Sequence, residues 1–155
     1  LMYCTVEEVL GAMKEDLQNN IIGDEYIEDP GERLEKMVKL SEEAIEDAGA
    51  EIDGYIAKRY RLPLSKVPPV LNKYAKDIAV YNLVSRMGVD ESDREKTFLN
   101  RYNAAIKFLL EVAKGTVDLD VEEPGNGIPG DGTAANGFRM SSSSRIFSRD
   151  SMKGW

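Results

Sequence analysis

Four closely spaced carboxylates are the side chains best placed for chemistry in this sequence. They form two pairs at four-residue spacing within a segment of helical periodicity: Glu42, Glu43, Glu46 and Asp47. Residues at i and i+4 share one helix face, so each pair could hold a divalent cation or share a proton. Helical bundles that bind two metals through such acids also use an inward Glu-x-x-His motif, and this chain has no histidine. The pattern favours a solvated helix face, and we predict no metal-binding residues.

Two further motifs resemble ligand sites but lack the context that those sites need. A G-x-G-x-x-G pattern starting at Gly125 has dinucleotide-loop spacing, yet no strand precedes it and no amphipathic helix follows. A D-x-D-x-E pattern starting at Asp118 resembles the opening of a calcium loop, but its sixth position is Glu123 instead of glycine. We interpret the first as a linker and the second as a solvated acidic turn, and we predict no cofactor.

Composition excludes most familiar enzyme mechanisms. The 155 residues include 20 Lys+Arg, 28 Asp+Glu, one cysteine and no histidine, for a formal net charge of −8. Without imidazole there is no Ser-His-Asp or Cys-His nucleophile pair and no His-ligated zinc or iron. Cys4 has no partner for an intramolecular disulfide and no base to activate it, which predicts an inert thiol in a reducing cytosol. We predict no catalytic residue and no enzymatic activity; an enzyme using carboxylates and a divalent metal is the weakest alternative.

Apolar spacing predicts an all-α fold, a small helical bundle of about four helices. Capping boxes at Thr5 and Ser92 and the prolines at 68 and 69 mark helix starts. Between the first two helices, residues 18–31 carry glycine and proline and are predicted to be a loop. The apolar runs are far shorter than the ~20 residues that span a bilayer, so we expect no membrane contact. The predicted helices run from Thr5 to Leu17, Glu32 to about Tyr60, Val67 to about Met87, and Ser92 to Gly115.

Beyond Gly115 the helical periodicity is lost and the charge changes. We divide the chain into a helical domain at 2–116, a Gly/Pro-rich linker at 117–137 and a long C-terminal extended arm at 138–155. Residues 1–120 carry the whole net charge of −8, whereas the last 18 residues have a net charge of +3. An acidic helical body therefore ends in a basic arm.

The arm combines aromatic with charged side chains, and three interpretations are open. Binding of nucleic acid would use phosphate pairing and base stacking, but four positive charges are few and the acidic body repels phosphate. The others are an unstructured tail and an arm that docks on a protein surface, with aromatic anchors oriented by arginines. We favour the docking arm. Its predicted protein-binding residues are Phe138, Arg145, Phe147, Arg149, Asp150, Lys153 and Trp155.

Three stretches, taken in order, carry a resemblance that covers nearly the whole chain. They are EIDGYIAKRYRLPL at 51–64, VPPVL at 67–71 followed by DIAVYNL at 77–83, and RIFSRDSMKGW at 145–155. Together they resemble the phage Mu gp36-like family of tailed-phage and prophage proteins.

The resemblance implies a structural virion protein, a head-tail connector (neck or head-completion) subunit that forms a ring between portal and tail. The implied partners are copies of itself in a homo-oligomeric ring, the portal and a tail-side adaptor, in the virion and, during assembly, in the host cytoplasm. DNA would pass through without specific binding, because an acidic lining repels phosphate. The alternative is a small cytosolic helical protein-binding module with a regulatory role. Both functions need a helical bundle and an arm that binds another protein, so the sequence pattern fits either one.

Overall fold

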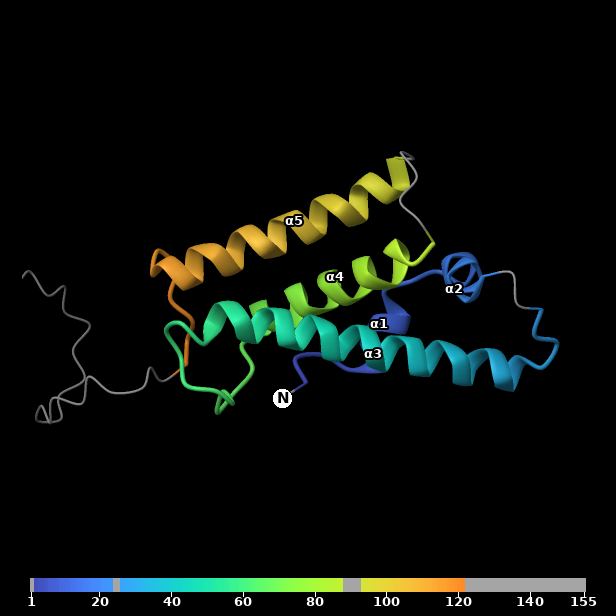
Figure 1. Ribbon diagram of the computed structural model, residues 1–155, viewed down its shortest axis with the longest axis horizontal. Coiled ribbons are helices and arrows are strands. Elements are labelled where there is room, and N and C mark those ends of the chain that lie inside the picture. Colours follow the sequence, from blue (N-terminus) through green and yellow to red (C-terminus); the bar gives the residue numbers. More distant parts are fainter. Residues whose placement is uncertain (1, 24–25, 88–92, 122–155) are drawn as a thin grey trace, which may run out of the picture.

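The computed structural model describes residues 2–23, 26–87 and 93–121, with backbone alone at 93 and 94. These residues form helices connected by short turns and loops, which confirms the predicted all-α class (Figure 1). Within the described ranges, no helix is long and apolar enough to span a membrane. The elements are α1 (Val6–Gly11), α2 (Glu15–Ile22), α3 (Pro30–Ile56), α4 (Pro69–Ser85) and α5 (Asp93–Lys114).

The three long helices alternate in direction and pack on one another, with α4 between α3 and α5 (Figure 1). Because α4 has neighbours on both sides, it is buried around much of its circumference. Nearly every turn of α4 therefore contains buried apolar residues. Its fully buried Leu71, Ile78 and Leu83 meet Ile52 of α3 and Leu109 of α5 in one core. The core lies along this three-helix layer, which α1 and α2 extend at one side.

The predicted first helix, Thr5 to Leu17, is wrong as a single element because the chain turns between α1 and α2. Its start is confirmed: the Thr5 hydroxyl accepts from the Glu8 amide at 3.3 Å and the Glu8 carboxylate accepts from the Thr5 amide at 2.9 Å. The turn is held by Gln18, whose amide donates to the carbonyls of Leu10 at 3.2 Å and Met13 at 3.3 Å. One polar side chain thus satisfies carbonyls that a continuous helix would have paired internally.

The predicted loop at 18–31 is wrong at both ends, because α2 continues to Ile22 and α3 already begins at Pro30. Asp29 caps α3 by accepting from the Gly31 amide at 3.1 Å, and Pro30 occupies the first turn, where its missing N–H is harmless. The long helix predicted from Glu32 is confirmed, although it ends at Ile56. Residues 30–36 of α3 contain no buried residue, so its first turns extend beyond the core.

The remaining helix ends follow the predicted signals. Pro69 opens α4 after Pro68, as the proline pair predicted. Gly115 ends α5 with φ +87°, a left-handed conformation that glycine adopts without a Cβ clash, and the Thr116 amide donates to the Glu111 carbonyl at 3.0 Å. The predicted cap at Ser92 lies outside the described residues.

Candidate docking surfaces

The predicted docking arm lies outside the described residues, so its role stays a prediction. The same holds for the glycine pattern that starts at Gly125. The structure instead shows what the helical body offers to such an arm. The arm residues concerned are Phe138, Arg145, Phe147, Arg149, Asp150, Lys153 and Trp155.

Arg59 fixes the start of the C-terminal segment against the body. Its guanidinium donates to the carbonyls of Val112 and Val117, both at 3.2 Å, and pairs with the Asp118 carboxylate at 2.7 Å. Arg59 follows the last turn of α3, so one side chain ties the end of α3 to the end of α5. The Val112 carbonyl in the last turn of α5, which also accepts from the Gly115 amide at 3.1 Å, thereby gains a cationic donor, the charge that the helix dipole favours there.

Tyr60 completes this attachment. Its hydroxyl accepts from the Leu119 amide at 2.8 Å, and both residues are buried. Val117 and Val121 are partly buried against the core on either side of Leu119. Residues 115–121, most of which the sequence assigns to the linker, therefore pack on the bundle. We call Arg59, Tyr60 and residues 115–121 the C-terminal clamp.

The N-terminal segment is held between α3 and α4 in a comparable way. The Asn72 amide donates to the Tyr3 carbonyl and to the Glu8 carboxylate, both at 3.0 Å, and the Tyr3 hydroxyl donates to Asp53. Cys4 beside them is buried, and burial followed by the Glu8 charge raises the pKa of its thiol to about 11. A protonated, enclosed thiol matches the inert cysteine that the sequence predicts.

The carboxylates of mid-α3 lie on a solvated face. Glu42, Glu43, Glu46 and Asp47 are all exposed, and Glu43 forms an ion pair with Arg86 at 3.7 Å. Among the residues that the structure describes, no group of His, Cys, Asp or Glu is clustered as metal ligands would be. Asp118, predicted in a solvated acidic turn, is exposed but pairs with Arg59.

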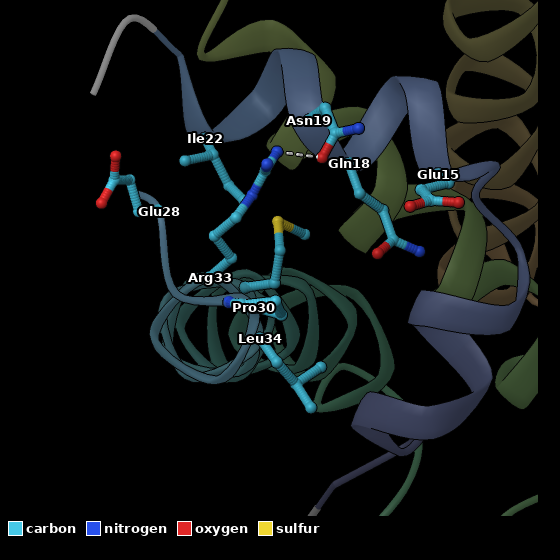
Figure 2. Close-up of a pocket in the computed structure, with 9 residues that line it drawn as sticks. Glu15, Gln18, Asn19, Ile22, Glu28, Pro30, Arg33 and Leu34 are labelled. Atoms are coloured by element: carbon cyan, nitrogen blue, oxygen red, sulfur yellow. Dashed lines mark hydrogen bonds between the residues drawn. The ribbon is translucent and has the colours of Figure 1, made fainter. Parts of the chain in front are cut away.

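A cleft of about 270 Å³ lies between α2 and the first turns of α3, which we call the α2–α3 cleft (Figure 2). It forms because α2 crosses α3 at its first turns, before α3 enters the core. Met37, only 2% exposed, is its most buried lining residue, whereas Leu34 is 57% exposed. Its lining residues are Glu15, Gln18, Asn19, Ile22, Glu28, Pro30, Arg33, Leu34 and Met37.

The polar side chains of this cleft bond within and around it. Figure 2 shows Arg33 reaching from α3 to α2, where its guanidinium donates to the Asn19 side chain. Glu28 accepts from the Tyr26 hydroxyl at 3.4 Å, and the Tyr26 side chain beside the cleft is 87% exposed. Two of the five large apolar side chains exposed in the described part of the chain, Tyr26 and Leu34, therefore lie at this end.

Charge separates this end from the rest of the body. Residues 14–56, which include α2 and α3, hold 4 Lys+Arg and 14 Asp+Glu, a net charge of −10. Residues 57–121 hold 12 Lys+Arg and 8 Asp+Glu, a net charge of +4. A second pocket, of about 210 Å³, has a basic lining, in which Lys14, at the start of the acidic segment, and Arg101 lie together with Phe98. The acidic residues of the body are thus concentrated on its α2–α3 side, and Glu7 and Glu8 of α1 add a further −2.

Sequence patterns missed both surfaces for the same reason. Arg59 and Asp118 are 59 residues apart, and no spacing rule links them. The only signal was the presence of Arg59 and Tyr60 in the stretch at 51–64 that carries the family resemblance. The α2–α3 cleft requires the turn between α1 and α2, which the continuous apolar spacing from Val6 to Leu17 conceals.

Comparison with known proteins establishes the family. The model of the family described as Bacteriophage Mu, Gp36 matches residues 3–136. The Mu-like prophage FluMu protein gp36 of Haemophilus influenzae is 32% identical over 114 residues, 74% of this chain and 74% of that protein. Gene product J of Escherichia phage Mu is 34% identical over 83 residues, 54% of this chain and 55% of that protein. The family match includes both the C-terminal clamp and the α2–α3 cleft, and the chain belongs to the Bacteriophage Mu gp36 family.

Proposed function

We propose that this gp36-family protein is a non-enzymatic structural subunit of the virion, a head-tail connector that assembles into a ring between portal and tail. Residues 138–155 bind an adjacent subunit or a neighbouring virion protein in this proposal. Family membership places the chain among phage and prophage proteins, and the ring and its position are the proposed step beyond that.

The C-terminal clamp is the observation that carries the proposal. Because Arg59 and Tyr60 hold residues 115–121 at one end of the bundle, the segment that leads to the basic arm starts from a fixed point. A subunit that extends a segment from one end, and offers a different surface to receive it, makes a heterologous contact. Repeated heterologous contacts close into a ring when the rotation between subunits allows it.

The acidic side of the body supports passage of DNA without binding. The exposed carboxylates of mid-α3 add to a net charge of −10 over residues 14–56. A lumen lined by such a surface repels phosphate, so that DNA moves through it without counterion-releasing contacts. A ring structure in which Lys and Arg line most of the lumen would overturn this part of the proposal.

The proposal is tested by solution mass. The full chain and a chain ending at Glu123 are compared by light scattering, alone and with the portal protein of the same phage, and particles are inspected by electron microscopy. We expect rings from the full chain, and a monomer with unchanged helical circular dichroism from the shortened chain. Phe147→Ala combined with Trp155→Ala should also prevent assembly, whereas Ser148→Ala in the same segment should not.

Two outcomes contradict the proposal in different ways. If the shortened chain has the same mass as the full chain, the arm is not the assembly element. If the full chain stays monomeric or dimeric with and without the portal, the connector role fails. In that second case the regulatory binding module becomes the better account.

A further inference from the structure

The α2–α3 cleft and the C-terminal arm have complementary chemistry. The cleft presents apolar side chains, with Leu34 57% exposed and Met37 2% exposed, beside the 87% exposed Tyr26. The arm carries Phe138, Phe147 and Trp155 in the sequence. We infer that the α2–α3 cleft receives residues 138–155 of an adjacent copy of this chain. The inference rests on the proposed assembly and names the surface that the arm uses.

Charge selects this cleft over the basic pocket at the start of α5. The charged residues that line the cleft are Glu15, Glu28 and Arg33, a net charge of −1. The last 18 residues have a net charge of +3. The other pocket has Lys14 and Arg101 in its lining, which repel a basic segment. Unlike charges therefore meet at the α2–α3 cleft and like charges at the other.

The cleft has a size that an aromatic side chain can fill. Its volume is about 270 Å³. A pocket of this size with an apolar floor and a charged rim matches the way in which an aromatic anchor is held at a protein interface.

The position of the clamp favours a neighbouring copy over the same chain. The cleft lies on the first turns of α3 and the clamp follows its last turn (Figure 1). At 1.5 Å per residue these points are roughly 35 Å apart. A coil as long as the 16 residues from 122 to 137 spans about 22 Å on average, and more than 50 Å only when fully extended. A relaxed linker therefore leaves residue 138, the start of the arm, short of the cleft of its own chain, whereas a head-to-tail neighbour brings its cleft to the clamp.

Disulfide trapping in the full chain tests this directly. Glu28→Cys places a thiol in the cleft lining and Ser151→Cys places one in the arm, while the buried Cys4 stays enclosed. After mild oxidation the double variant should give a ladder of covalent oligomers on denaturing gels. A double variant with Glu42→Cys, on the exposed face of mid-α3, and Ser151→Cys is the matched control and should give at least about tenfold less product, because its thiol lies outside the cleft.

A second pair of variants tests the apolar contact. Leu34→Glu in the double-cysteine chain should lower the ladder yield at least about tenfold, and Leu34→Met should retain it. Leu110→Glu alters a leucine of α5 that is 39% exposed, outside the cleft, and should leave the ladder unchanged. Thermal unfolding checks that all three variants stay folded.

The possible results separate this inference from the proposed function. Rings of wild-type mass without the cross-link overturn the docking site and leave the connector proposal intact. A ladder from a chain that never forms rings supports the docking site and contradicts the connector proposal. A cross-link confined to single chains overturns docking between copies.

Discussion

The C-terminal clamp and the α2–α3 cleft lie at opposite ends of α3 and differ in how completely they are built. At the clamp, Arg59 and Tyr60 bond the backbone of residues 112–119, and Leu119 is buried. At the cleft, Leu34 and Tyr26 remain exposed although apolar and aromatic surface is the kind that proteins bury. The described side chains at the clamp end are bonded and largely buried, whereas the cleft end presents surface that a contact could cover.

This difference shows how one helix can serve two purposes. The second half of α3 faces α4 and α5 and is buried at every turn, whereas residues 30–36 have no buried side chain. Substitutions near the clamp should therefore change stability, and substitutions at the cleft rim should change association. Matched substitutions along α3 can test that separation.

The largest difference is expected within the cleft itself. Met37→Ala removes a lining side chain that is 2% exposed and should lower the free energy of unfolding by about 2–5 kcal/mol. Leu34→Ala, one turn earlier and 57% exposed, should change it by less than about 0.5 kcal/mol. Urea unfolding measured by circular dichroism compares the two. Equal losses would mean that the rim belongs to the core.

The clamp should depend on its polar bonds. Arg59→Ala removes the donor to two carbonyls and the ion pair with Asp118, and we expect a loss of about 2 kcal/mol in unfolding free energy. Arg33→Ala is the matched change at the cleft, where the guanidinium has a side-chain partner, and should cost less than about 0.5 kcal/mol. Chemical denaturation measures both. A loss at Arg33 as large as that at Arg59 would remove the distinction between the ends.

Local sequence signals predicted the helices whose boundaries are set locally. Apolar spacing located α3, α4 and α5. The cap at Thr5 marked the start of α1, the proline pair marked the start of α4, and Gly115 marked the end of α5. These signals act within one turn of helix, so neighbouring residues suffice to read them. The all-α class followed from the same patterns.

Apolar spacing and helix caps do not predict contacts between segments that are distant in the sequence. The turn at Met13 depends on Gln18 bonding back to Leu10, and the clamp depends on Arg59 meeting residues near 118. The apolar spacing from Val6 to Leu17 fits one helix as well as two, because it records which residues are buried and not what buries them. The cleft follows from that turn and was missed with it.

Two glycines allow a matched test of backbone strain at the two ends. Gly23, after α2, has φ +82° and ψ −155°, a region that is essentially restricted to glycine, and Gly23→Ala should cost about 1–2 kcal/mol. Gly115, at the clamp, has φ +87° and ends α5, and Gly115→Ala should cost about 1 kcal/mol. Asparagine tolerates the left-handed helix cap, so Gly115→Asn should recover part of the loss, and Gly23→Asn should not. Thermal unfolding of the four variants measures these losses. Equal recovery by asparagine at both sites would contradict the assignment of a glycine-only backbone conformation to Gly23.

The smallest expected effect is a pH dependence in the last turns of α3, next to the clamp. The Tyr102 hydroxyl donates to Glu51 at 2.9 Å, and burial followed by this bond raises the pKa of Tyr102 from its usual 10 to about 12. The folded state therefore keeps the phenol protonated where the unfolded chain ionises it. Its contribution to stability is complete below pH 10 and is lost as pH rises toward 12.

Tyr102→Phe isolates this contribution, because it removes the ionisation and the bond together while the ring still stacks on Tyr81. At pH 8 the variant should be less stable than the wild type by about 1 kcal/mol, and the two should converge between pH 10 and 12. Urea unfolding across that range, with absorbance titration of the phenols, measures the effect. A gap that stays constant with pH would mean that Tyr102 ionises equally in the folded and unfolded chains. The bond to Glu51 would then not shift its pKa, and pH could not be used to loosen this end of α3 selectively.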